Sequence, residues 1–313
     1  MFGGAVSLLI DSLAKDTPLR WPYLTGFTLL GLALSGSGAW LLGSARAGVG
    51  LSLAATDPQG DPGRYQSDAD DFAQYGAAHF LFHTTVQAQV VAPADLRELH
   101  NRLDSAVHTL NRAEPRARTV GLLFTGRHEV GFHVGGRLRP SSRRFDLYFP
   151  TGGTGDSHFP AVRLAAAPSA EPRPLELRLA TDADFAPITL QDLTGRFTTG
   201  TCLALAVNVV SPAGNATFAA QILQSARAEG AAAVVVAELP AGSTHPMPTT
   251  THEFESTVAA IAAVAAAMPA APGLLYLRAP VIIAVALGRY LHNAGWIPMR
   301  HDRATSTYER FLA

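Results

Sequence analysis

The sequence predicts an α/β fold in which two similar halves follow a hydrophobic N-terminal segment. The halves are evident in residues 121–139 (GLLFTGRHEVGFHVGGRLR) and 273–291 (GLLYLRAPVIIAVALGRYL), which align without a gap. The same offset places VGLSLAAT, from Val49, on TCLALAVNVV, from Thr201. Each copy is an apolar run, a polar corner and apolar residues at helical spacing, which is the strand–turn–helix unit of a parallel sheet.

The alignment matches residues of similar character in the two halves. The matched pairs are Leu122 with Leu274, Phe124 with Tyr276, Gly136 with Gly288, and Arg137 with Arg289. Because two strands in each half share one offset, we interpret the pattern as an internal duplication. The alternative is that both stretches are ordinary strand–helix units of an α/β protein.

The composition argues against several classes of protein. The chain has 313 residues, enough for two packed units and an appendage. A net charge of -1 lacks the basic footprint of a general nucleic-acid binder. Lys15 is the only lysine, which argues against P-loop, Ser-Lys and Schiff-base enzymes. The single cysteine, Cys202, excludes an intrachain disulfide and a thiolate metal cluster, and a buried inert thiol is expected.

The N-terminal segment has two parts. Residues 1–16 place apolar side chains on one helical face, which predicts either a short amphipathic helix in a membrane interface or a frayed leader. Residues 21–43 carry no charge and are long enough to cross a hydrocarbon core of roughly 30 Å at about 1.5 Å per residue. Trp21 and Trp40 lie near the two ends, where aromatic rings prefer the headgroups. We therefore expect one transmembrane helix.

A cleaved signal peptide and a buried core helix are the alternatives for this stretch. Its apolar core is long for a signal peptide, and a core helix of a soluble domain normally keeps a polar face. The flanking charges are balanced and do not indicate the topology.

The remaining elements follow from apolar periodicity and from clusters of Gly, Pro and Asp. In the first half we expect a strand from Val49, a loop over 56–71, helices over 70–87 and 93–111, a strand over 119–125, a helix over 129–138 and a strand over 145–149. Residues 152–196 read as a connector with irregular strands. In the second half we expect a strand over 202–209, a loop over 211–217, a helix over 218–229, a strand over 232–237, a helix over 254–268, the repeated strand and helix, and a strand over 297–299.

The second half, with a strand running into SPAGNATF, an AAAVVVAEL strand, the GLLYLRAPVIIAVALGRYL unit and Tyr308 near its end, resembles the SAVED domain. That domain is a pair of fused CARF-like Rossmann units. The first half, with ARTVGLLFTGRHEVGFHVGGRL, FDLYFP and FPAVRL, resembles the partner unit of membrane-anchored members. The expected domains are 1–46 (amphipathic and transmembrane segment), 47–166 (first CARF-like unit), 167–199 (connector) and 200–313 (second CARF-like unit).

The resemblance implies a sensor of a cyclic oligonucleotide second messenger, and cyclic oligoadenylate is the ligand expected. The messenger would come from a CD-NTase in CBASS or from a type III CRISPR complex. Because the hydrophobic segment is the only effector candidate, we expect a non-enzymatic protein of the bacterial inner membrane with a cytoplasmic SAVED domain. On binding ligand it would form homo-oligomers and disrupt the membrane in anti-phage abortive infection. No cofactor, metal or DNA partner is expected.

Two other functions stay open. One is an anchored phosphodiesterase, similar to a ring nuclease, in which Arg127, His128 and Tyr148 stabilise a cyclising phosphate. The other is a tethered binder of an unrelated nucleotide, since Rossmann-like pairs bind many ligands.

The expected ligand site lies where strands end, because ligands of open parallel sheets bind outside the carboxyl ends of the strands. Phosphates favour Arg and backbone N–H groups at helix N-termini, and bases favour stacking and hydrogen bonds. The candidate residues are Thr56, Asp57, Gln59, Thr125, Gly126, Arg127, His128, Ser211, Gly214, Asn215, Thr217, Leu277, Arg278 and Ala279. Arg127 and Arg278 are the principal candidates, whereas Arg137 and Arg289 are expected to be structural.

Two other kinds of site, a metal site and a hydrolase site, have little support in the sequence. His79 and His83 are spaced i, i+4, which would put both on one face of a helix, yet no third metal ligand is evident and a packed or surface pair is expected. A Ser-His-Asp hydrolase is not supported, because the chain has no Gly-x-Ser-x-Gly elbow.

Overall fold

A computed structural model describes residues 48–56, 62–138, 144–150, 158–181, 184–210, 216–240, 247–268, 272–302, 305 and 307–311. The predicted amphipathic and transmembrane segments lie outside these residues and stay predictions. So do the candidate site residues Asp57, Gln59, Ser211, Gly214 and Asn215. Among the helices that the structure describes, none combines the length and apolar character needed to cross a bilayer.

The first half forms a five-stranded sheet in the order β2-β1-β3-β4-β5. Four neighbouring strands are parallel, and the last one runs antiparallel to β4. The strands are β1 (Val49–Thr56), β2 (Phe82–Gln89), β3 (Thr119–Thr125), β4 (Arg144–Pro150) and β5 (His158–Leu164).

The second half forms a seven-stranded sheet in the order β12-β11-β10-β8-β9-β6-β7. Its parallel strands are β8 (Leu203–Asn208), β9 (Ala233–Glu238), β10 (Gly273–Arg278) and β11 (Trp296–Asp302). Its antiparallel strands are β6 (Glu176–Ala180), β7 (Ala186–Ile188) and β12 (Thr307–Arg310).

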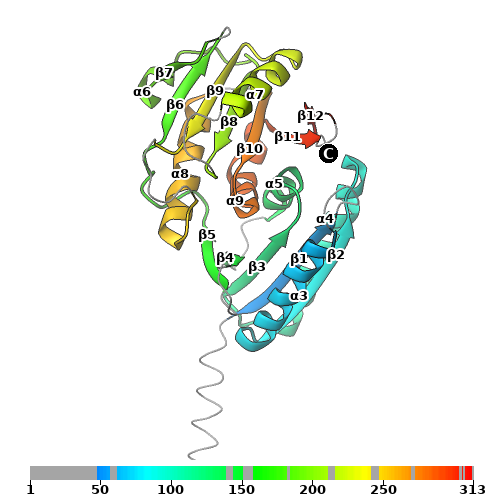
Figure 1. Ribbon diagram of the computed structural model, residues 1–313. Coiled ribbons are helices and arrows are strands. Elements are labelled where there is room, and N and C mark those ends of the chain that lie inside the picture. The colour runs from blue at the N-terminus through cyan, green and yellow to red at the C-terminus, as the bar shows by residue number, and fades with distance from the viewer. Residues whose placement is uncertain are drawn as a thin grey trace, which may run out of the picture. The chain divides into compact units, whose positions relative to one another are not determined.

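Helices alternate with the parallel strands in both halves (Figure 1). In the first half they are α3 (Pro62–His79), the 3-10 turn η1 (Pro93–Asp95), α4 (Leu96–Ala113) and α5 (His128–Arg137). In the second half they are α7 (Ala216–Ala228), α8 (Thr251–Ala267), α9 (Val281–Leu291) and the 3-10 turn η2 (His292–Ala294), with a short α6 (Leu190–Leu193) in the connector. The order β9-β8-β10-β11-β12 repeats that of the first sheet. The predicted α/β organisation in two halves is therefore confirmed.

The ungapped alignment itself is wrong by one residue at the repeated unit. Leu122 contributes to the core shared by α4, α5, α8 and α9, whereas its aligned partner Leu274 belongs to the core under α7. A shift of one residue moves a strand side chain to the other face of its sheet, so these two leucines are not structural equivalents. Position by position, the structure pairs Leu122 with Leu275 and Phe124 with Leu277, which share the first core.

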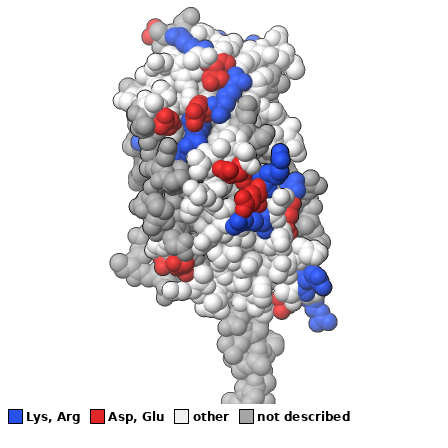
Figure 2. Space-filling view, turned by 90° about the vertical axis from the view of Figure 1, so that its right-hand side faces the viewer, with Lys and Arg blue, Asp and Glu red and all other residues white. Residues whose placement is uncertain are grey.

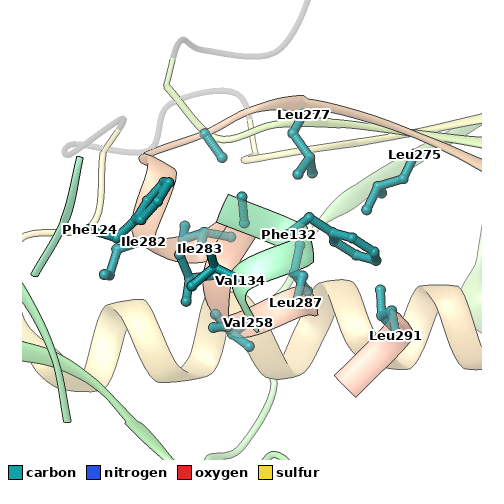
Figure 3. Packing of buried hydrophobic residues seen from close by; sticks show 14 of the residues in the cluster. Phe124, Phe132, Val134, Val258, Leu275, Leu277, Ile282, Ile283, Leu287 and Leu291 are labelled. Atoms are coloured by element: carbon teal, nitrogen blue, oxygen red, sulfur yellow. The ribbon is translucent and has the colours of Figure 1, made fainter. Parts of the chain in front are cut away.

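The main core lies where α5 and α9 pack against each other across the two halves (Figure 3). Their backbones come into contact at two glycines. An added Cβ at Gly135 would overlap the carbonyl oxygen of Val285, and one at Gly288 would overlap that of Phe132. Only glycine permits so close an approach. The N-termini of α5 and α9 lie at the carboxyl ends of β3 and β10, because each helix follows its strand after a short corner.

One predicted element is wrong. Residues 70–87 were expected to form a helix after a loop over 56–71, but α3 already begins at Pro62, where proline suits a first helical turn, and ends at His79. The second part of that range is β2, in which buried Val86 and Ala88 alternate with exposed glutamines. The alternation has period two, which is the strand period rather than the helical one. The predicted helix over 93–111 is confirmed by η1 and α4.

On the face shown in Figure 2, charged side chains of both signs are interspersed. Several form ion pairs, including Arg137 with Asp104 and Arg310 with Glu229. This pattern matches the net charge of -1. An anionic ligand would therefore be held by local arginines rather than by a broad positive field.

Candidate ligand-binding pocket

A pocket of about 660 Å³ lies at the carboxyl end of β10, where the α5 corner of the first half meets the second half. The first half contributes Arg127, His128 and Glu129. The second half contributes the end of β10, the first turns of α7, and side chains of β11 and β12. This is the edge of the sheet at which ligands of open parallel sheets bind.

Many of the residues predicted from the corners meet in this pocket. Those that line it are Arg127, His128, Thr217, Leu277, Arg278 and Ala279. Three other predicted residues do not line it. Thr125 is buried at the end of β3, and Gly126 follows it with a φ of 155°, its Cβ position facing the Phe124 ring. Thr56 lies at the end of β1, where its hydroxyl donates to the Ala88 carbonyl at 3.4 Å.

The pocket also contains residues that the sequence reasoning missed. They are Glu129, Val210, Phe218, Gln221, Met299, His301 and Tyr308. The predicted site residues all lie at corners, whereas Met299 and His301 lie within β11 and Tyr308 lies in β12. The pairing of β11 with β10 brings β11 to the pocket, because neighbouring parallel strands end at the same edge, and no local sequence pattern shows this pairing.

Two arginines from different halves face the pocket. Arg127 occupies the N-cap position of α5, its side chain is only 16% exposed, and its guanidinium lies 3.9 Å from the Glu129 carboxylate. The guanidinium of Arg278 lies 5.9 Å from the centre of the Phe218 ring, within cation–π range. Guanidinium groups bind phosphate oxygens in a fork geometry, so this pair suits an anionic ligand.

His128 joins the two halves at the edge of the pocket. Its Nε2 lies 2.5 Å from the carbonyl oxygen of Ala279. Burial lowers the pKa of His128, and the hydrogen bond to Ala279 counteracts this in part. Since a carbonyl oxygen only accepts, Nε2 carries the proton.

Aromatic rings form another wall. The rings of Tyr308 and His301 have centroids 4.8 Å apart, and Tyr308 meets buried Tyr276 edge to face at 5.1 Å. Burial raises the pKa of Tyr308, although Arg278 lowers it, so the phenol is neutral at pH 7. The rings of His301 and Tyr308, which line the pocket, offer surfaces on which nucleic-acid bases stack. The amide of Gln221 adds a donor and an acceptor.

The other patterns from the sequence do not form a site. His79 ends α3 and stacks on Tyr75, whereas His83 lies in β2 with Nε2 at 3.1 Å from the Ser52 hydroxyl, so the two do not share a helical face. Among the described residues no group of three or more His, Cys, Asp or Glu side chains is placed to hold a metal ion. Arg137 does not line this pocket and instead forms an ion pair with Asp104.

No family model and no curated protein matches the sequence. Among solved structures, the chain is similar to the Cap4 SAVED/CARF-domain containing receptor of Acinetobacter baumannii with the cyclic trinucleotide 3'3'3'-cAAA. The TM-score is 0.50 at 9% identity, covering 86% of this chain and 52% of that chain. The described part of the chain has the SAVED/CARF fold. The α/β fold with parallel sheets is thus consistent with the predicted SAVED domain.

The same receptor with 2'3'3'-cAAA gives a TM-score of 0.49 at 10% identity, covering 92% of this chain and 55% of that chain. This chain spans about half the length of the receptor, so the likeness applies to the SAVED/CARF fold and not to the whole receptor.

Proposed function

We propose that this chain senses a cyclic oligonucleotide, which binds in the pocket between the α5 corner and the second half. The observation that carries the proposal is the convergence of Arg127 and Arg278, from different halves, on one pocket with aromatic walls. The SAVED/CARF fold supports it, because the similar Cap4 receptor structure contains a cyclic trinucleotide. A pocket of about 660 Å³ lies within the usual size range of small-molecule sites.

The pocket matches the parts of such a ligand. Phosphates bind Arg127 and Arg278, and a base stacks against the ring of His301 or Tyr308. Gln221 supplies hydrogen bonds to a base edge or a ribose. Cyclic oligoadenylate is the ligand that we propose.

The response that we propose is disruption of the bacterial inner membrane. Residues 21–43 anchor the chain in the membrane, the SAVED domain lies in the cytoplasm, and ligand binding drives homo-oligomerisation that gathers the anchors. The uncharged anchor segment supports the membrane part of this proposal, and the SAVED/CARF fold supports the sensing part. The messenger comes from a CD-NTase or a type III CRISPR complex.

A phosphodiesterase function has less support in the pocket. Of the three residues named for it, Arg127 and His128 line the pocket, but the Tyr148 ring packs against Phe72, Tyr75 and Phe80 under α3. We therefore propose a sensor without catalysis. Incubation of the chain with 3'3'3'-cAAA, followed by chromatography, tests this point, since cleavage products would contradict it.

Calorimetry with cyclic di-, tri- and tetranucleotides tests the binding function. We expect one adenine-containing ring to bind, and expect the double variant Arg127→Ala/Arg278→Ala to lose on the order of 100-fold in affinity, because hydrogen bonds to charged groups are worth about 1.5–3 kcal/mol each. The matched control is Arg112→Ala, which removes an exposed arginine of α4. Failure of the whole panel to bind would refute the proposal.

Dye release from liposomes that carry the full chain tests the membrane response. We expect release that depends on the bound ring and that the double arginine variant does not show. Release that is the same with and without ligand would contradict a ligand-gated effector, even if binding is confirmed.

A further inference from the structure

The hydrogen bond between His128 and Ala279 fixes the chemistry of the His128 ring. The Ala279 carbonyl has no proton to give, so Nε2 donates and must carry a hydrogen. Burial lowers the pKa of His128, which keeps the ring neutral at pH 7. A neutral imidazole with its proton on Nε2 has a lone pair on Nδ1. Nδ1 is therefore an acceptor and cannot donate.

The His128 ring also faces the pocket. It lines the pocket and is only partly buried. Within the described residues its hydrogen bond is the one through Nε2, which leaves Nδ1 for a ligand. A group bound beside this ring thus meets a fixed acceptor.

We propose that His128 is a specificity-determining residue whose Nδ1 accepts a hydrogen bond from a donor of the bound ligand. The inference rests on the proposed function and deepens it. In a cyclic oligonucleotide, the donors are amino groups and ring N–H groups of bases and the ribose 2′-hydroxyl. Phosphate oxygens and base carbonyl oxygens only accept, so they are disfavoured at this position. The phosphates are then left to Arg127 and Arg278.

The equivalent position in the second half shows that the histidine is not a requirement of the fold. Arg127 and Pro280 are the N-cap residues of α5 and α9, so His128 corresponds to Val281. Val281 packs against the core and offers no hydrogen bond from its side chain. An apolar residue is therefore compatible with the first turn of such a helix, and the histidine adds chemistry at only one corner.

The first experiment measures binding of the wild-type full chain to 3'3'3'-cAAA and to two analogues. In one analogue purine riboside replaces adenosine and removes the exocyclic amino group, and in the other 2′-deoxyadenosine removes the hydroxyl. We expect one analogue to bind about 5- to 10-fold more weakly, which is the usual worth of one neutral hydrogen bond. The weaker analogue identifies the donor. Equal affinity of all three rings would overturn the inference.

The second experiment repeats these titrations with His128→Phe, which keeps a planar ring and removes both nitrogens. We expect the difference in affinity between the parent ring and the weaker analogue to vanish in this variant, because the acceptor is gone. A purely structural role would weaken all rings by the same factor and leave the difference intact, which would overturn the inference. His108→Phe, at an exposed position of α4, is the matched control and retains the difference.

The third experiment needs no ligand. Nitrogen NMR of the wild-type chain, with His128 assigned by comparison with His128→Phe, reports which ring nitrogen is protonated. We expect Nε2–H with bare Nδ1 at pH 7, and the opposite tautomer or a doubly protonated ring would overturn the inference. If this tautomer is found but no ring binds, the proposed function and the inference both fail. If a ring binds but the affinity difference between it and the weaker analogue is unchanged in His128→Phe, only the inference fails.

Discussion

The corner after β3 and the corner after β10 occupy equivalent places in the two halves but carry different chemistry. The first reads Thr125-Gly126-Arg127-His128, and the second reads Arg278-Ala279-Pro280-Val281. Arginine stands at the N-cap position of α5 in the first corner and at the last position of β10 in the second. Because α5 and α9 cross, these two offset positions both reach one pocket.

The comparison shows which part of a duplicated fold must stay alike. The helix crossing is nearly symmetric, since Gly135 meets Val285 and Gly288 meets Phe132. The corners, which meet the ligand in our proposal, have diverged. Backbone contact fixes the glycines, whereas an asymmetric ligand environment needs different side chains on its two sides.

The largest expected effect comes from breaking the symmetric crossing. In Gly135→Ala the new Cβ would overlap the Val285 carbonyl, which belongs to a backbone and cannot turn aside. We expect a loss of about 3 kcal/mol or more in the free energy of unfolding, at the upper end of overpacking effects. Thermal or urea unfolding measures it. Gly131→Ala is the matched control on the same helix, since its new Cβ would meet only side-chain atoms, 3.1 Å from the Phe124 ring and 3.3 Å from the Val285 side chain, and we expect a smaller loss. Equal losses would contradict the importance of the backbone contact.

The contact between the halves is also sensitive to pH through His133 on α5. Its Nε2 donates to the Phe311 carbonyl at 3.3 Å, and burial lowers the pKa of His133 to about 4. Between about pH 6.5 and pH 4 the unfolded chain binds a proton that the folded chain does not. The contribution of His133 to the free energy of unfolding is therefore complete above about pH 6.5. It is lost as the pH falls, and the total loss is on the order of 3 kcal/mol.

Denaturation at several pH values tests this dependence. His133→Gln keeps an amide that can donate to the Phe311 carbonyl but removes the titrating ring. We expect this variant to have a flatter decline of unfolding free energy between pH 6.5 and pH 4. His108→Gln, an exposed position of α4, serves as the control. A decline as steep as that of the wild type would show that other groups control the acid sensitivity.

The two arginines allow a sharper comparison of the corners. Arg127 has the Glu129 carboxylate 3.9 Å from its guanidinium, whereas Arg278 lies near the Phe218 ring. A nearby carboxylate offsets part of the attraction to an anionic ligand. We therefore expect Arg278→Ala to weaken binding of 3'3'3'-cAAA by about 10- to 50-fold and Arg127→Ala by less. Calorimetry on the two single variants measures this difference, and the reverse order would contradict it.

Features that depend on the local sequence could be predicted, whereas features that depend on neighbours in space could not. The apolar runs and polar corners predicted the repeated strands, the following helices and both pocket arginines. The pattern over 70–87 is ambiguous because the described side chains of α3 are mostly exposed and β2 is an edge strand with only Val86 and Ala88 buried near its end. A weak pattern of that kind does not separate a helix from a strand.

The register of the repeat could not be read from residue similarity. Two runs of leucines align equally well after a slip of one residue, and only packing decides which face each side chain takes. Met299 and His301 were missed for a related reason, since their strand joins the pocket through pairing with β10. Such long-range pairing leaves no mark in the local sequence.

The smallest expected effect is that of Glu129→Gln. Glu129 is buried in the first turn of α5, where the helix dipole stabilises a carboxylate, and its charge faces Arg127 in the pocket. The amide keeps the shape and removes the negative charge, so we expect affinity for an anionic ring to rise about 3-fold as Arg127 is released to the ligand. The gain should disappear in Glu129→Gln/Arg127→Ala. A gain that persists without Arg127 would mean that Glu129 repels the ligand directly, and the first corner would then differ from the second by its acid rather than by its restrained arginine.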